Sequence, residues 1–276
     1  MAAVIFGLMF SSTPCRATTF NWVAAPAFTD AQPSTNGATN KVDYWAATGN
    51  AISVTLGNTG GGMVPTGFPQ VSTSVLSNGG AANGLVIRTS SEPTVSTFIS
   101  VTINFMYTTG ATGVSFNLWD VDATVSGGTG FIDTVANISG KTPGGATVFA
   151  TANNTHTSNP GTSYNIISGT QNTASLTISG DPAQAAGAAN LTDQGQVNLS
   201  FSTAVTSVTF NYYNTAATSR TTQTLGIGPI TFTGTGTAFP EVNSSGAALM
   251  LCGGMMGFGL VRRRRNADRS PCESNA

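Results

Sequence analysis

Hydrophobic and polar residues alternate along many short stretches of this chain, and turn-forming residues separate the stretches. In the stretch GVSFNLW, Val114, Phe116 and Leu118 take every second position and polar residues fall between them. A period of two residues is typical of a strand with one buried face. Comparable stretches occupy residues 51–57, 70–76, 84–89, 96–107, 113–122, 130–139, 163–168, 174–179, 196–202, 205–213 and 225–233.

These stretches predict an all-β body over residues 18–233. The chain has 276 residues, of which 33 are glycine, and only 8% are charged. Many short strands separated by Gly, Asn and Ser turns are typical of a sandwich of two antiparallel sheets. We therefore expect an antiparallel β-sandwich, jelly-roll-like in its connections, with helices only at the two ends of the chain.

The charges of the body exclude one class of partner and offer little for catalysis. Residues 18–238 hold eight acidic and four basic residues, so this part is mildly acidic and has no basic patch. A nucleic-acid-binding surface needs clustered Lys and Arg. The body has one histidine, His156 in a polar loop, and one glutamate, so we name no catalytic residues and predict that the protein is not an enzyme.

The three cysteines lie only near the two ends. Cys15 is in the N-terminal segment, and Cys252 and Cys272 are in the last quarter of the chain. The body therefore has no internal disulfide, no cysteine metal site and no thiol nucleophile. Its stability must come from core packing.

The N-terminal segment has the order of a secretory signal peptide. Residues 2–10 form an apolar run, and small residues then precede and include Ala17. Small side chains at the −3 and −1 positions of a cleavage site fit cleavage after Ala17, so residues 1–17 are predicted to be a signal peptide. The alternative is that residues 4–10 form a buried first strand.

The C-terminal segment has the order of a membrane anchor. Residues 244–261 carry no charge, and Arg262, Arg263, Arg264 and Arg265 follow directly. Eighteen helical residues span roughly 27 Å, close to the hydrocarbon thickness of a bilayer. We predict a transmembrane helix over 244–261, a basic cytoplasmic tail over 262–276 and the body on the other side of the membrane.

A short motif precedes this helix and gives it a second interpretation. Pro240 and Glu241 stand in the linker 234–243, and with the apolar span and the arginine cluster they make a three-part signal. This signal resembles the PEP-CTERM sorting signal of Gram-negative bacteria, although Val242 replaces the usual second proline and residues 266–276 follow the arginines. The alternatives are a plain tail anchor and a soluble core helix.

The resemblance implies a route to the cell surface. In that family a membrane-embedded exosortase is thought to process the tail, so it implies an exosortase-like enzyme and the inner membrane as partners. The protein would be exported and held in the inner membrane before processing. It would then reach the cell surface or extracellular matrix, where polysaccharide is a further candidate partner.

Three aspartates form the most specific candidate site of the body. Asp120 and Asp122 follow a predicted strand, and Asp133 lies early in the next one. A carboxylate is costly on a core-facing stripe, so we expect the chain to leave the sheet and place the acids at its rim. Three converging carboxylates would suit Ca²⁺ as a structural cofactor. The alternatives are that they cap loop amides or, remotely, that they act in catalysis.

Aromatic residues supply a weaker candidate site. Trp119 and Tyr212 are the residues considered for stacking on a sugar ring. The alternative is that both pack in the core or between layers, where large aromatics are common.

Together these features predict an exported surface or matrix protein with a structural or adhesive, non-enzymatic role. The alternative is a carbohydrate-binding module of the cell envelope, and a more remote one is an envelope glycoside hydrolase. Fold class alone does not separate these functions.

Overall fold

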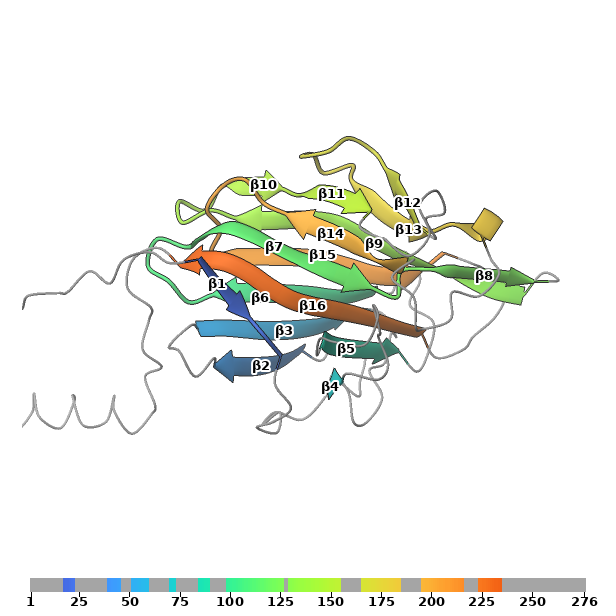
Figure 1. Cartoon of the computed structure of the whole chain (residues 1–276), viewed down its shortest axis with the longest axis horizontal. Coiled ribbons are helices and arrows are strands. Elements are labelled where there is room, and N and C mark those ends of the chain that lie inside the picture. The colour runs from blue at the N-terminus through green and yellow to red at the C-terminus, as the bar shows by residue number, and fades with distance from the viewer. Residues whose placement is uncertain are drawn as a thin grey trace, which may run out of the picture. The chain divides into compact units, whose positions relative to one another are not determined.

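The described part of the chain is all-β. The computed structural model describes residues 17–22, 39–45, 51–59, 70–72, 84–89, 98–126, 129–154, 165–184, 195–215 and 223–234. Within these ranges the one helical element is the 3₁₀ turn η1 (Pro182–Gln184), Gly195 also has 3₁₀ geometry, and the rest is strands and their connections (Figure 1). The predicted fold class is therefore confirmed at the level of an all-β protein.

The first sheet has seven strands. Its order is β11 (Thr151–Asn154), β14 (Val197–Ser200), β7 (Ala111–Trp119), β16 (Gln223–Gly234), β5 (Gly84–Thr89) and β4 (Gln70–Ser72). β1 (Ala17–Phe20) pairs with the C-terminal half of β16. We call this the seven-stranded sheet.

The second sheet has nine strands. Its order is β12 (Asn165–Ser168), β13 (Thr177–Gly180), β9 (Thr129–Lys141), β15 (Ser207–Asn214), β6 (Phe98–Phe105), β3 (Ala51–Thr59) and β2 (Thr39–Trp45). β8 (Ala123–Ser126) and β10 (Thr147–Phe149) also pair with β9. All pairings of both sheets are antiparallel among the described strands, an arrangement consistent with a β-sandwich.

The core lies between the inner faces of the two sheets. In β6 the burial alternates along the strand, with Ile99, Val101 and Ile103 fully buried and the residues between them half-buried. The rings of Phe116 on β7 and Phe210 on β15 lie 6.4 Å apart, which joins the two sheets directly. The two-residue hydrophobic period of the sequence thus becomes the inner face of each sheet.

The predicted strands agree with the structure in position more than in extent. Each of the eleven stretches contains a strand, but five described strands were not predicted: β1, β2, β8, β10 and β11. The stretch 113–122 was predicted too long, because β7 ends at Trp119. These differences matter at the candidate site, where the chain changes sheets directly after Trp119.

The predicted ends of the chain lie largely outside the described residues. The chain divides into two compact units, Met1–Ala238 and Phe239–Ala276, and no residue of the second is described. The predicted transmembrane helix 244–261, Pro240, Glu241 and Arg262–Arg265 therefore remain sequence predictions. Of the predicted signal peptide only Ala17 is described, as the first residue of β1. No helix among the described residues is long and apolar enough to cross a membrane.

Candidate functional site

The chain crosses from one sheet to the other at Asp120–Asp122. β7 ends at Trp119 in the seven-stranded sheet, and β8 begins at Ala123 and pairs with β9 of the nine-stranded sheet. Asp120 has a φ of 62°, in the left-handed region that aspartate tolerates better than most residues. This backbone conformation turns the chain out of β7. The turn agrees with the expectation that a carboxylate is too costly on the core-facing side of a longer strand.

The crossing leaves part of β16 without a β7 neighbour. β7 pairs with β16 from Gly226 onward, with Gly226 opposite Trp119. β16 begins three residues earlier, at Gln223. Thr224 therefore lies beside the crossing, where it contacts two residues of the site.

Hydrogen bonds join the three aspartates to strands of both sheets. The Thr224 hydroxyl donates to Oδ2 of Asp120, and the Tyr212 hydroxyl lies 2.7 Å from Oδ1 of Asp133 and 3.2 Å from the carbonyl oxygen of Thr224. The amide of Asp133 donates to the carbonyl of Asp122 at 2.9 Å. We call Asp120, Asp122, Asp133, Tyr212 and Thr224 the carboxylate network.

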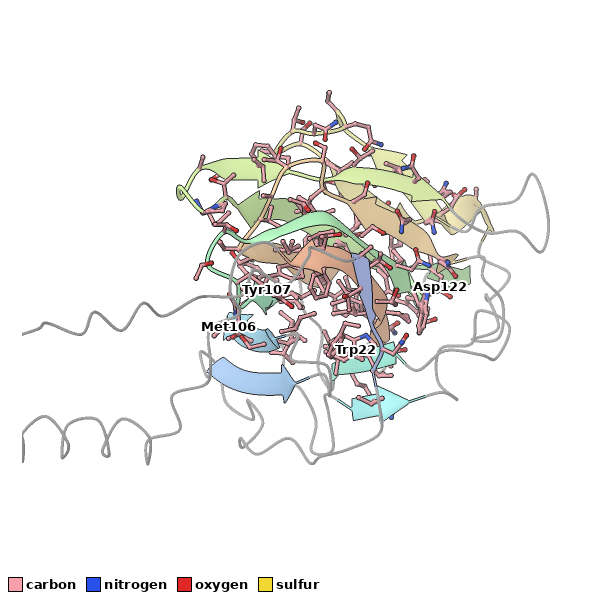
Figure 2. All side chains as sticks on the ribbon, turned by 60° about the vertical axis from the view of Figure 1, so that its left-hand side comes forward. Trp22, Met106, Tyr107 and Asp122 are labelled. Atoms are coloured by element: carbon pink, nitrogen blue, oxygen red, sulfur yellow. The ribbon has the colours of Figure 1, made fainter. Side chains whose placement is uncertain are left out.

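Asp122, Asp133 and Tyr212 are buried, contrary to the predicted rim position of the acids, whereas Asp120 and Thr224 are half-buried. Asp122 is 4% exposed, Asp133 is 1% exposed and Tyr212 is fully buried. Asp122 lies near one side of the molecule in Figure 2, across from Tyr107, which packs against the far end of β16. The prediction that the strand is left at this point was right, but Asp122 and Asp133 turn inward instead of outward, and only Asp120 stays partly exposed.

Burial raises the pKa values of the three aspartates and of Tyr212, and so favours their neutral forms. It raises the pKa of Asp120 to about 6, against the opposing hydrogen bond from Thr224. Burial and the charge of Asp120 raise the pKa of Asp122 to about 7. The pKa of Asp133 is raised well above its usual value by burial and by the charges of Asp122 and Asp120. Burial, and then the charge of Asp133, raise the pKa of Tyr212 as well.

The Tyr212 hydroxyl connects Asp133 with the backbone of Thr224. The Tyr212 hydroxyl has one hydrogen but contacts two oxygens, those of Asp133 and Thr224. It is the donor toward both, and it lies closer to Oδ1 of Asp133, at 2.7 Å, than to the carbonyl oxygen of Thr224, at 3.2 Å. The raised pKa values favour the neutral carboxylic acid over the carboxylate at all three aspartates.

Two glycines allow other strands to pack against the crossing. A Cβ on Gly180, the last residue of β13, would lie 2.0 Å from the carbonyl oxygen of Asp122. A Cβ on Gly195 would lie 3.2 Å from the amide nitrogen of Val121, which donates to the carbonyl of Gly195. Close backbone approach thus excludes a side chain at position 180 and leaves little room for one at position 195.

The structure brings the three candidate metal ligands together but does not arrange them as a metal site. Among the described residues no group of three His, Cys, Asp or Glu side chains is placed to hold a metal ion. The carboxylate oxygens instead accept from Thr224 and contact Tyr212. Calcium stays a prediction of the sequence, and the geometry supports a structural hydrogen-bond network.

The two candidate sugar-stacking residues have no exposed ring. Trp119 is 3% exposed, and its indole lies against Gly84 and Gly228, where a Cβ would come within 2.4 and 2.8 Å of it. Tyr212 is fully buried and belongs to the carboxylate network. Stacking on a sugar needs an accessible ring face, so the geometry gives no support to this role for either residue.

The sequence did not indicate Thr224 or the pairing of Tyr212 with Asp133. Residues 133 and 212 are 79 positions apart, and residues 120 and 224 are 104 apart. Both contacts depend on which strands become neighbours, which no local pattern specifies. The one available signal was general, since a buried carboxylate needs a hydrogen-bond partner somewhere.

Comparison with known proteins adds no relative. The chain matches no protein family model, and no curated protein and no solved structure matches it. The functional argument therefore rests on the chain's own sequence and geometry.

Proposed function

We propose that this protein is an exported cell-surface or extracellular-matrix protein with a structural or adhesive, non-enzymatic role. The observation that carries the proposal is the order of segments along the chain. An apolar N-terminal segment, a cysteine-free all-β body ending at Gly234, the Pro240–Glu241 pair, an uncharged span and four arginines follow one another. That order is expected of a protein delivered across the inner membrane and sorted by a PEP-CTERM-like tail.

The outward-facing residues of the sheets support a coating or adhesive role. On the nine-stranded sheet the hydroxyls of the half-buried Thr102 and Thr209 lie 3.0 Å apart. On the seven-stranded sheet Asn198 donates to Asn117 at 2.9 Å. These ladders are neutral hydroxyl and amide groups, which can exchange hydrogen bonds with polysaccharide or with neighbouring proteins without a strong charge preference.

The proposed route involves the membrane and a processing enzyme. The helix 244–261 would hold the protein in the inner membrane of a Gram-negative bacterium, with Arg262–Arg265 on the cytoplasmic side. An exosortase-like enzyme would recognise the segment that begins at Pro240 and release the body to the cell surface or matrix. The jelly-roll-like connection of the sandwich belongs to the same proposal.

No observation favours the two alternative functions. A carbohydrate-binding module would present aromatic rings, but Trp119 and Tyr212 are buried. A glycoside hydrolase needs two carboxyl groups facing a cleft at a set separation. Asp120 and Asp133 are instead tied to Thr224 and Tyr212 inside the protein.

Deletion of residues 240–265 tests the proposal in a Gram-negative host that carries an exosortase. We expect the deleted protein to lose retention at the envelope and to appear in the medium or periplasm, as followed by fractionation and immunoblotting. The matched control removes residues 266–276 and leaves the three-part signal intact. If the deletion leaves export and retention unchanged, the sorting role is wrong.

A second variant separates a processed tail from a plain anchor. The double substitution Pro240→Ala and Glu241→Ala keeps the apolar span and the arginines. We expect it to block release of the body while the chain stays in the membrane fraction at full mass. A plain tail anchor would show no difference from the parent protein.

A further inference from the structure

The strand β1 lies beside β16 on the seven-stranded sheet. β7 pairs with one side of β16 from Gly226 to Gly234, so β5 and β1 share the other side (Figure 1). On that side β5 pairs with residues 223–227 and β1 pairs with residues 230–233. We call this side of β16, over residues 228–233, the β1 slot.

Two aromatic side chains anchor β1 in the β1 slot. Phe20 and Trp22 are each 1% exposed and belong to the hydrophobic core, and their rings meet edge to face with centroids 4.9 Å apart. The indole nitrogen of Trp22, a residue labelled in Figure 2, donates to the carbonyl oxygen of Gly228 at 2.8 Å. Removal of β1 would expose this part of the core to water, so the slot favours occupation by a strand of this sequence.

The chain does not connect β1 to its pairing partner by a short turn. Thr19 and Thr231, which lie opposite each other, are 212 positions apart in the sequence. The strand that follows, β2, belongs to the other sheet, and residues 23–38 lead to it. A segment of this length spans at most roughly 55 Å, which is comparable to the diameter of a domain of this size. It is therefore long enough for β1 to reach the slot of an adjacent copy as well as its own.

We propose that neighbouring copies of this chain exchange β1, so that β1 of one copy occupies the β1 slot of the next. The exchanged strand forms the same backbone ladder and buries the same two aromatic rings as it does within one copy, so the exchange needs no new contact surface. A short tether gives a strand an effective concentration on the order of 1 mM at its own slot. Exchange therefore competes where copies are crowded to about this concentration, as in a surface layer.

Exchange of β1 would link copies through their seven-stranded sheets. Reciprocal exchange between two copies closes as a two-fold dimer, and one-way exchange continues from copy to copy. Both give the proposed surface or matrix protein a means of assembly with itself. The inference follows from β1 and β16, and it does not depend on the C-terminal sorting signal.

Disulfide formation between Thr19 and Thr231 positions measures the exchange. Both residues are exposed, and their hydroxyls lie 3.4 Å apart. Opposed residues of an antiparallel pair have Cα atoms about 4.5–5.5 Å apart, within the range that a disulfide spans. One full-length chain carries Thr19→Cys and a second carries Thr231→Cys, and in both chains the three native cysteines are replaced by serine. A specific disulfide between the two chains then requires β1 of the first in the slot of the second.

The two chains, with tags of different mass, are mixed in urea, refolded together and oxidised mildly. We expect a disulfide-linked heterodimer at about 1 mM protein, and at least about tenfold less of it at about 10 µM. The matched control combines Thr19→Cys with Thr233→Cys. Thr233 lies opposite Ala17, so it is diagonal to Thr19 at roughly 7–8 Å, beyond the reach of a disulfide.

A single chain with both Thr19→Cys and Thr231→Cys checks the pairing itself. At low concentration it should close an internal disulfide and remain a monomer, because β1 then occupies its own slot. This variant separates a wrong register from an absence of exchange.

A peptide of residues 17–22 tests what the exchanged strand occupies. An excess of this peptide, ATTFNW, should compete for the β1 slot by strand addition and reduce the yield of heterodimer. The matched peptide carries Phe20→Ala and Trp22→Ala. It keeps the backbone but lacks both anchors, so it should leave the yield unchanged.

Three results would overturn the proposal. They are a heterodimer yield at the higher concentration that does not exceed the yield of the control pair, equal effects of the two peptides, and failure of the double-cysteine chain to close its internal disulfide. A chain that exchanges β1 but is not retained at the envelope would contradict the proposed function and leave the exchange standing.

Discussion

The hydroxyl of Tyr212 on β15 lies 2.7 Å from Oδ1 of Asp133 on β9, and both side chains are buried. The two strands are neighbours in the nine-stranded sheet, with Tyr212 opposite Val135, so Asp133 occupies the diagonal position. The same hydroxyl reaches the carbonyl of Thr224 in the other sheet at 3.2 Å. One phenol thus connects both sheets at the point where the chain crosses between them.

Tyr212→Phe is predicted to destabilise the protein by about 1–3 kcal/mol, because it leaves buried oxygens of Asp133 and Thr224 without their partner. The ring and its packing are retained, so the loss reports the hydroxyl. The free energy of unfolding from urea denaturation at neutral pH measures it.

The matched control for this variant is Tyr213→Phe. Tyr213 is the next residue of β15, is half-buried and has no place in the carboxylate network. Its change is expected to stay within about 0.5 kcal/mol. Equal losses for the two variants would show that the Tyr212 hydroxyl has no special role.

The carboxylate network is predicted to make the protein less stable as the pH rises. The folded-state pKa values of Asp120 and Asp122 are raised to about 6 and about 7 from an ordinary value of 3.8. The folded state therefore binds more protons than the unfolded state between these values, and the slope of unfolding free energy with pH is negative. This contribution is fully present below pH 3.8 and is lost as the pH rises to about 7.

Urea midpoints at about pH 5 and about pH 8 measure this slope. We expect a higher midpoint at the lower pH, and we expect Asp122→Asn to reduce the difference because it removes one titrating group. A midpoint that rises with pH in the parent protein would contradict the raised pKa values.

The sequence predicts the class of fold because the two-residue period reports burial directly. Val114, Phe116 and Leu118 alternate in the sequence and are buried in β7. Strands such as β11 (TANN) and β10 (TVF) are too short to show a period, and they are defined by pairing with partners far away in the sequence. Local patterns therefore find the central strands and miss the short ones.

The sequence predicted which aspartates belong to the candidate site, but it did not predict how they are arranged. The cost of a carboxylate on a core stripe correctly indicates that β7 stops before Asp120. It does not indicate whether the released acids turn outward to solvent or inward to partners. That choice depends on Tyr212 and Thr224, whose strands reach the crossing only in the folded sandwich.

Gly180→Ala is predicted to destabilise the protein by at least about 2 kcal/mol, because overpacking against backbone is not relieved by a side-chain rotation. The added Cβ would lie 2.0 Å from the carbonyl oxygen of Asp122, so β13 or the crossing must move. The control is Gly144→Ala, where the nearest heavy atom is Thr142 Oγ1 at 3.9 Å. Thermal unfolding of the two variants should differ clearly, and similar melting temperatures would contradict the close packing of β13 on the crossing.

Calcium is predicted to have no effect on stability at neutral pH. In the described structure one oxygen of Asp120 accepts from Thr224 and one of Asp133 accepts from Tyr212, and the raised pKa values of Asp122 and Asp133 favour protons that a cation would have to displace. A ligand at a hundred times its dissociation constant stabilises a protein by about 2.7 kcal/mol, which would raise the melting temperature of a chain of this size by several degrees. We therefore expect less than about 2 °C between melting curves in EDTA and in millimolar CaCl₂. A larger increase that disappears in Asp122→Asn would instead assign the crossing as a calcium site, and an increase that persists in this variant would place calcium elsewhere in the chain.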